Sequence, residues 1–248
     1  RRAGLKVGML TSPHLVRLGE RLQVNRKAIS DGEIADFVDY LQPIAEGLAR
    51  NNPEDHPSFF ELITAMGFLL FAREQVDVAV VETGLGGRLD ATNVVDPILT
   101  IITSVAMDHL AQLGNNLASI AKEKAGIIKQ AKPVVIGRMP FEAKEVIARV
   151  AESQQAKLFQ VETLFPHAPR DLPITNLEGA FQRWNAGVTL LASQVLASQF
   201  GLKESLVRAA LQEVDWPGRW QRFELDGRTL ILDATHNEEG ALALDDNL

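Results

Sequence analysis

Short apolar runs of strand length alternate with longer segments of helical periodicity along most of this chain. Between the first two runs, apolar residues recur at helical spacing from Ile34 to Leu48 after a Ser30–Glu33 capping pattern, and a second pattern of this kind begins at Ser58. Because parallel strands need helical crossovers, the alternation predicts an α/β fold with a mostly parallel sheet and flanking helices. The strand-like runs are residues 7–11, 76–82, 99–105, 134–137 and 158–161.

The alternation stops near residue 216. The sequence Trp-Pro-Gly-Arg at 216–219 interrupts it, and strand-like segments at 220–224 and 229–233 then flank Asp226–Gly227, a β-hairpin signal. We therefore expect residues 1–224 to form one domain and residues 225–248 to form a hairpin strand and the start of a second domain. Residues 1–6 are typical of a helix end and residues 240–248 of a helix start, so we expect a fold truncated at both ends.

Composition excludes several classes of protein. The 25 Lys and Arg residues against 32 Asp and Glu residues give a net charge of −7, so a general nucleic-acid-binding surface is not expected. The absence of Cys excludes a disulfide scaffold and thiolate chemistry and is typical of a cytoplasmic protein. No apolar run approaches the length of a membrane span, and nothing in the sequence indicates obligate assembly, so we expect a soluble monomer.

The most informative segment is the strand-like run that ends at Glu82 and the glycine-rich turn after it, Thr-Gly-Leu-Gly-Gly-Arg at 83–88. Ligands of open α/β sheets bind beyond the carboxyl ends of strands, where Glu82 is expected. Glycines there let backbone N–H groups approach a bound group. The segment matches neither a Walker A motif nor a dinucleotide fingerprint, and a tight turn with a solvated Glu82 is the less favoured alternative.

Asp108 and His109 follow the next strand-like run, 99–105. If this strand is a neighbour of the one before Glu82, then Glu82 and His109 point to the same place, and a carboxylate with a neutral imidazole suits a divalent cation. A loop hydrogen bond or a helix cap is the simpler interpretation of the Asp108–His109 pair.

Three further patterns permit two interpretations each. Lys122 and Lys124 lie just before Gly126, where cations stabilise a helix C-terminus. The segment Thr11–His14 is either a capped loop or a ligand loop. The segment 233–237, with Arg219 upstream, either caps a helix or reaches the ribose and phosphates of a nucleotide.

Taken in order along the chain, these motifs resemble the folylpolyglutamate synthase/dihydrofolate synthase family of the Mur ligase superfamily. The resemblance covers nearly the whole chain, and the run at 84–93 is its most specific part. The motifs that carry it are Thr-Ser-Pro-His-Leu at 11–15, Ser-Phe-Phe-Glu at 58–61, Glu-Thr-Gly-Leu-Gly-Gly-Arg-Leu-Asp-Ala-Thr-Asn at 82–93, Asp-His at 108–109, Glu-Lys-Ala-Gly-Ile at 123–127, Trp-Pro-Gly-Arg at 216–219 and Asp-Ala-Thr-His-Asn at 233–237.

The resemblance implies a Mur ligase-like central ATPase domain and an ATP-dependent amide ligase. In this family a folate or dihydropteroate carboxylate attacks the γ-phosphate of ATP, and the amine of L-glutamate displaces phosphate from the acyl phosphate. Because a carboxylate approaching a triphosphate meets like-charge repulsion, the reaction needs Mg²⁺ and positioned cations. The implied partners are small molecules only, with no nucleic acid and no membrane.

The resemblance also implies roles for individual residues. Glu82, His109 and Lys124 are the implied catalytic residues and metal ligands, Lys124 as a carbamate. The implied ATP contacts are Asn185, Arg219, Asp233 and His236. The implied folate contacts are Thr11, Ser12, Pro13, His14, Phe60, Gly87, Asp90 and Ala91.

The sequence departs from the family pattern in three respects. The Gly-rich phosphate loop expected before Arg1 is absent, and so is the domain expected after Leu248, so we expect the 248-residue chain by itself to be inactive. Position 181 is Phe where the family usually has His. Two alternatives stay open: a Mur-type ligase with another acceptor, and an inactive nucleotide-binding homologue.

Overall fold

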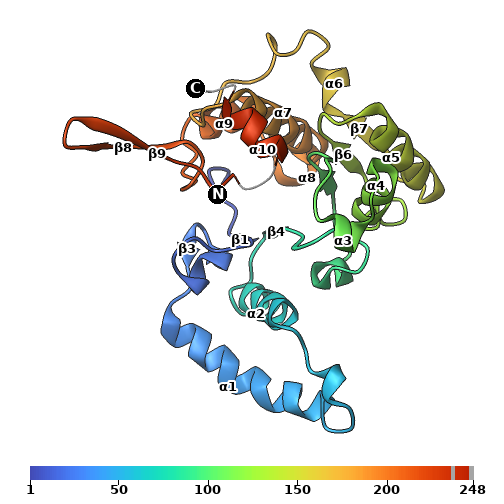
Figure 1. The fold of residues 1–248 in the computed structure, drawn as a ribbon, viewed down its shortest axis with the longest axis vertical. Helices are drawn as coiled ribbons and strands as arrows, with labels where there is room; N and C mark the ends of the chain where they lie inside the picture. Colours follow the sequence, from blue (N-terminus) through green and yellow to red (C-terminus); the bar gives the residue numbers. More distant parts are fainter. Residues whose placement is uncertain (236–237, 246–248) are drawn as a thin grey trace. The chain divides into compact units, whose positions relative to one another are not determined.

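The computed structural model describes residues 1–235 and 238–245, which form two compact units, Arg1–Val95 and Asp96–Leu248 (Figure 1). The described residues form a four-stranded sheet in the first unit and a three-stranded sheet and a two-stranded hairpin in the second, and helices flank the two larger sheets. The expected α/β class with a mostly parallel sheet is confirmed. Within the described residues, no helix is both long enough and apolar enough to cross a membrane.

The first unit contains a four-stranded sheet in the order β3-β2-β1-β4. Strand β1 pairs parallel with β4 and antiparallel with β2, and β2 pairs antiparallel with β3. The sequence analysis predicted β1 and β4 but not the short strands β2 and β3. The strands are β1 (Val7–Leu10), β2 (Leu22–Val24), β3 (Lys27–Ala28) and β4 (Val78–Val81).

Two helices connect the antiparallel strands to β4, and both begin at the predicted capping boxes. Helix α1 (Asp31–Leu48) starts after Ser30, and α2 (Phe59–Arg73) starts after Ser58. The Ser58 hydroxyl accepts the Glu61 N–H over 3.3 Å, while the Glu61 carboxylate accepts the Ser58 N–H over 2.7 Å. Hydrogen bonds from the Ser58 side chain and backbone lower the pKa of Glu61. Three 3-10 helices complete this unit, η1 (Leu18–Arg21), η2 (Pro53–Asp55) and η3 (Ala91–Val94).

The core of the first unit lies between the sheet and these two helices. Leu10 and Leu22 are fully buried and pack against apolar residues of α1 and α2. A Cβ on Gly67 of α2 would lie 2.7 Å from Leu10 Cδ1, so a glycine lets the helix approach the sheet closely.

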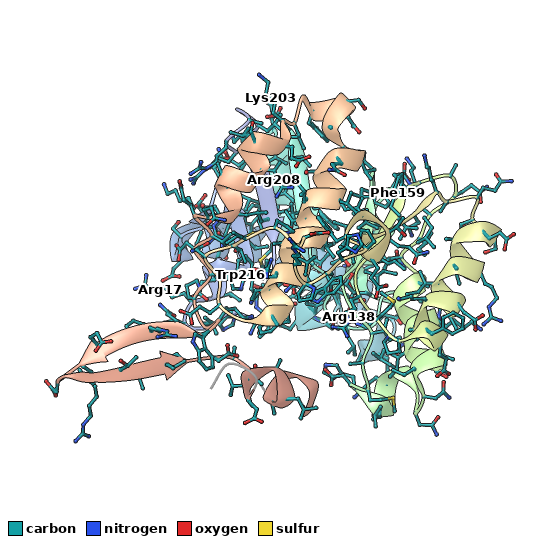
Figure 2. The ribbon with its side chains drawn as sticks, turned by 90° about the horizontal axis from the view of Figure 1, so that it is seen from above. Arg17, Arg138, Phe159, Lys203, Arg208 and Trp216 are labelled. Carbon is teal, nitrogen blue, oxygen red and sulfur yellow. The ribbon has the colours of Figure 1, made fainter. Side chains whose placement is uncertain are left out.

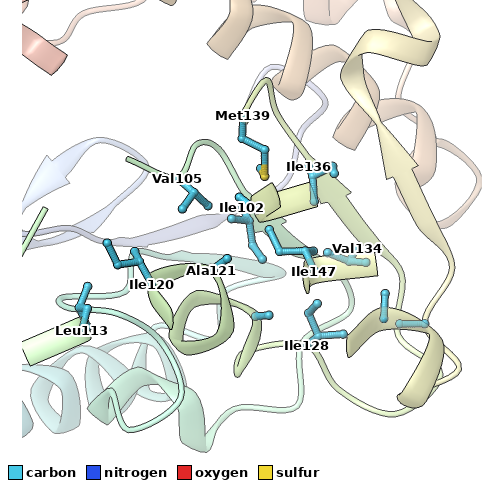
Figure 3. Packing of buried hydrophobic residues seen from close by; sticks show 14 residues of the cluster. Ile102, Val105, Leu113, Ile120, Ala121, Ile128, Val134, Ile136, Met139 and Ile147 are labelled. Atoms are coloured by element: carbon cyan, nitrogen blue, oxygen red, sulfur yellow. The ribbon is translucent and has the colours of Figure 1, made fainter. Parts of the chain in front are cut away.

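The second unit is built around a parallel sheet in the order β5-β6-β7. Its middle strand is buried on both faces. Val134 and Ile136 belong to the cluster under α4 and α5 (Figure 3), and Val135 belongs to the cluster under α7. Helices on both faces of a parallel sheet are the expected arrangement. The elements are β5 (Thr100–Ile102), β6 (Val134–Ile136), β7 (Leu158–Gln160), α4 (Leu117–Ala125), α5 (Phe141–Ser153) and α7 (Ala180–Val195).

The remaining elements of the second unit include the predicted hairpin. Strands β8 (Gln221–Leu225) and β9 (Arg228–Leu232) pair antiparallel, and Asp226 and Gly227 both have positive φ at the turn. The expected domain boundary after residue 224 lies within β8 and stays a prediction. The other helices are α3 (Leu110–Leu113), α6 (Val161–Leu164), α8 (Ala197–Phe200), α9 (Glu204–Leu211) and α10 (Glu238–Asp245).

We expect Ser58→Ala to destabilise the protein by about 1 kcal/mol, because the substitution removes the oxygen that caps α2. The urea midpoint of unfolding measures this loss. Ser205→Ala is the control, since Ser205 is exposed on α9 and lies outside its N-cap position. Equal midpoints for the Ser58→Ala variant and the parent protein would contradict the assigned cap.

Candidate active site

Glu82 and the segment Thr11–His14 lie at the same edge of the first sheet. Glu82 directly follows β4 and Thr11 directly follows β1, and these two strands are parallel neighbours. The Ser12 N–H donates to Glu82 Oε2 over 2.8 Å. The structure therefore joins two segments that the sequence analysis treated as separate candidates.

The rest of the Thr11–His14 segment contacts residues that the sequence analysis did not select. Pro13 is exposed, whereas the half-buried His14 accepts a hydrogen bond at Nδ1 from Arg21 Nε over 2.9 Å. The Arg21 guanidinium also lies 5.4 Å from the ring centroid of Phe59, the first residue of α2. Burial lowers the pKa of Arg21. No sequence motif marks Arg21, and only the fold brings it to His14.

Asp90 organises the glycine-rich loop after β4. Its Oδ2 accepts the N–H groups of Gly84 and Leu85, each over 2.9 Å, and its Oδ1 accepts the Thr92 N–H over 2.9 Å and the Thr92 hydroxyl over 2.5 Å. A carboxylate that accepts four hydrogen bonds fixes the path of its own loop. The structure thus gives Asp90 a positioning role that the sequence analysis did not identify.

Phe60 packs against this loop. A Cβ on Gly84 would lie 2.5 to 2.9 Å from three atoms of the Phe60 ring, so only a glycine fits beneath the ring. Gly87 is buried, and the half-buried Ala91 is the first residue of η3, which packs against α2. The predicted folate contacts Phe60, Gly87, Asp90 and Ala91 therefore lie around one helix start and one loop.

His109 has a left-handed backbone conformation in the second unit. Its φ is 50° and its ψ is 43°, at the position just before α3. The His109 N–H donates to Asp108 Oδ1 over 2.7 Å, and His109 Nε2 lies 3.8 Å from Asp108 Oδ2. Positive φ at a residue other than glycine costs of order 1–3 kcal/mol and is concentrated at functional sites.

Lys124 lies in the last turn of α4, and the pKa of its amine is lowered. Burial lowers the pKa of Lys124, and the nearby negative charge of Asp108 opposes that shift in part. The structure therefore brings Lys124 near the Asp108–His109 pair. A desolvated amine holds its proton less tightly and is a better nucleophile, unlike a lysine that only complements a helix dipole.

Asp233 and Arg219 also lie together. Asp233 Oδ1 accepts the Thr235 N–H over 2.9 Å, and its Oδ2 accepts the Trp220 N–H over 2.8 Å. Burial raises the pKa of Asp233, but the hydrogen bonds from Thr235 and Trp220, together with the Arg219 charge, outweigh that effect, so the pKa is lowered. His236, the neighbouring candidate, lies outside the described residues.

Asn185 is an exposed residue of α7, and its Nδ2 donates to Gln182 Oε1 over 3.1 Å. Trp184, the residue before it, stacks with Arg138, whose Cζ lies 5.4 Å from the Trp184 ring centroid. Arg138 is exposed and follows β6, so it places a cation at the carboxyl end of that strand. The sequence analysis did not select Arg138.

Two of the predicted metal ligands, Glu82 and His109, follow strands of different sheets. Within residues 1–235 and 238–245, no group of three or more His, Cys, Asp or Glu side chains is placed to hold a metal ion. The strands before Glu82 and His109 were expected to be neighbours, but β4 belongs to the first sheet and β5 to the second. The shared magnesium site therefore stays a prediction.

Comparison with known proteins identifies relatives over almost the full chain. A folylpolyglutamate synthase from Lacticaseibacillus casei is 34% identical over 96% of this chain and 60% of its own length. A dihydrofolate synthase/folylpolyglutamate synthase from Bacillus subtilis is 38% identical over the same shares. A solved folylpolyglutamate synthase in complex with AMPPCP and folate superposes on 99% of this chain and 65% of its own, with a TM-score of 0.88 at 30% identity.

Over nearly its whole length, the chain is similar to members of the folylpolyglutamate synthase/dihydrofolate synthase family. This finding confirms the resemblance found in the motifs, although no family model matches the sequence. The chain spans about 60% of the length of these curated relatives. The agreement of sequence and fold extends over both units, since the matches cover 96% and 99% of this chain.

We expect Gly84→Ala to destabilise this protein by about 1–3 kcal/mol, because the new methyl group overlaps the Phe60 ring. Urea denaturation measures the loss. Gly47→Ala on α1 is the matched control: a Cβ there meets nothing within 4 Å, so this variant should be neutral or slightly more stable. Equal loss in both variants would show that packing on Phe60 is not the cause.

Proposed function

We propose that this protein is an ATP-dependent ligase that joins L-glutamate to the carboxylate of a folate or a dihydropteroate. The observation that carries the proposal is the superposition of 99% of the chain on a folylpolyglutamate synthase solved with AMPPCP and folate. The two sites of that reaction correspond to two sets of candidate residues, one around β1, β4 and α2 and the other in the second unit.

The proposed reaction has two steps. The acceptor carboxylate attacks the γ-phosphorus of ATP, the bond to the β-phosphate oxygen breaks, and ADP leaves. The amine of L-glutamate then attacks the acyl carbon, an amide forms, and inorganic phosphate leaves with the bonding electron pair while the amine loses a proton. The first step brings anions together, so it depends on positioned positive charge.

Glu82, His109 and Lys124 are the residues we propose for Mg²⁺. A carboxylate oxygen and an imidazole nitrogen are suitable donors, and the Ser12 N–H already orients the Glu82 carboxylate. When bound, Mg²⁺ neutralises negative charge on the triphosphate. The left-handed backbone at His109 orients its ring relative to Asp108, at 3.8 Å between Nε2 and Oδ2.

Lys124 enters this site as a carbamate in our proposal. Carbamate formation requires an unprotonated amine, and burial lowers the pKa of Lys124 in the direction that supplies it. The nitrogen attacks the carbon of CO₂, a C–N bond forms, and the nitrogen loses a proton. The cation becomes an anion with two oxygens, a suitable ligand for Mg²⁺.

The nucleotide contacts we propose are Arg219, Asp233, Asn185 and His236. Asp233 is held by the Trp220 and Thr235 N–H groups, and its charge lies near that of Arg219. One positioned anion and one positioned cation suit the ribose hydroxyls and the phosphates, respectively.

The acceptor contacts we propose are the Thr11–His14 segment together with Phe60, Gly87, Asp90 and Ala91. Phe60 offers an aromatic surface for a pterin ring, and Asp90 holds the adjoining loop. We further propose that the protein acts in the cytoplasm, in keeping with its lack of Cys, and that it is a monomer.

Glutamate-dependent release of ADP tests the proposed function. The complete gene product that carries this sequence is assayed with ATP, Mg²⁺ and L-glutamate, and with dihydropteroate or tetrahydrofolate as the acceptor. We expect release with at least one acceptor, and the active acceptor identifies the step.

Two other results would overturn the assignment. ADP release only with an unrelated carboxylic acid would indicate a Mur-type ligase with another acceptor. ATP binding without release for any acceptor would indicate a nucleotide-binding homologue that has lost catalysis.

We expect Lys124→Ala and Lys124→Arg to abolish ligation, because neither side chain forms a carbamate. Lys122→Ala is the matched control, since Lys122 is exposed on the same helix and should be dispensable. Carbon NMR with isotopically labelled bicarbonate should show a carbamate signal in the parent protein and in the Lys122→Ala variant but not in the Lys124 variants. Full activity of the Lys124→Arg protein would refute the carbamate.

A further inference from the structure

The carboxylate of Glu20 binds the backbone of residues 15–17, which form the crest of the loop between β1 and η1. It accepts the N–H of Leu15 over 2.8 Å, that of Val16 over 3.2 Å and that of Arg17 over 2.8 Å. Hydrogen bonds from Leu15 and Arg17 are the main cause of a lowered pKa at Glu20, so the carboxylate is ionised at neutral pH. Three consecutive backbone donors therefore converge on one charge.

Burial contributes little to the conformation of this crest. The Leu15 side chain is 53% exposed and the Val16 side chain 82% exposed, and Arg17 is exposed as well (Figure 2). An exposed loop without apolar packing samples many conformations unless hydrogen bonds restrict it. The Glu20 carboxylate supplies that restriction.

Other hydrogen bonds hold the first half of the same loop. At its start, the Ser12 N–H donates to Glu82, and the Thr11 N–H donates to the Arg21 carbonyl over 2.9 Å. In the middle, Arg21 Nε donates to His14. Glu20 and Arg21 are adjacent in η1, so one short helix holds both the crest and His14.

We propose that Glu20 is a positioning residue for the acceptor: it presents the Thr11–Arg17 loop, with the apolar Leu15 and Val16 side chains at its crest, to the folate or dihydropteroate. This inference rests on the proposed function, which places the acceptor at Thr11–His14. Glu20 acts through the backbone of the loop and takes no part in the transfer of the phosphoryl group.

The test compares three variants of the complete gene product. Glu20→Gln removes the charge and one acceptor oxygen at nearly constant size, and Glu20→Asp keeps the charge. Glu33→Gln is the matched control, because Glu33 also accepts a backbone N–H at a helix start, that of Ser30 over 2.9 Å, outside the loop.

Two measurements are made on each variant. In Glu20→Gln, we expect the amides of residues 15–17 to exchange hydrogen faster. We also expect the KM for the acceptor to rise about tenfold, the ratio that corresponds to the loss of one charge-assisted hydrogen bond. The kcat and the KM for ATP should change by less than about twofold, because the Glu20 carboxylate binds the backbone of residues 15–17 and is not one of the proposed nucleotide or Mg²⁺ contacts. Glu20→Asp should restore part of the acceptor affinity, and Glu33→Gln should match the parent protein.

The possible failures are distinguishable. Unchanged exchange at residues 15–17 would overturn the anchoring role, and faster exchange with an unchanged acceptor KM would show that Glu20 only stabilises the loop. A parent protein without ligation in the presence of any acceptor would refute the proposed function and with it the acceptor part of this inference, while hydrogen exchange still decides whether Glu20 anchors the loop.

Discussion

The parallel pairing of β1 with β4 is the constraint on which the first unit depends. Parallel neighbours end at the same edge of a sheet, so the loop after β1 and the residue after β4 have to meet. The hydrogen bond from the Ser12 N–H to Glu82 is the direct result. The pairing also requires a long crossover, and α1 and α2 supply both that crossover and the apolar cover of the sheet.

In three loops of the candidate site, a carboxylate accepts hydrogen bonds from nearby backbone N–H groups. Asp90 holds the loop after β4, Glu20 the loop after β1, and Asp233 the segment after β9. A backbone N–H that donates to a charge forms a stronger hydrogen bond than one that donates to a neutral oxygen. Loops of this kind stay ordered without being buried, which leaves their outer surface available to a substrate.

Local patterns in the sequence predicted most elements and their order. The capping boxes at Ser30 and Ser58 mark the starts of α1 and α2, because a cap needs residues only three positions apart. The Asp226–Gly227 turn marks the hairpin for the same reason. Strands β2 and β3 were not predicted because segments of three and two residues carry no measurable period. The pairing of β2 with β1 and of β3 with β2 defines them.

The sequence by itself determined the α/β class, the family motifs and the identities of the candidate residues. Only the tertiary structure decided how those residues are held. Burial lowers the pKa of Lys124, and the backbone at His109 is left-handed. Glu20, a residue of η1, accepts hydrogen bonds from the loop that it anchors. The physical reason is the distance along the chain over which each effect acts. Capping and periodicity act over a few residues, whereas desolvation and the meeting of distant backbone groups depend on where the whole chain folds.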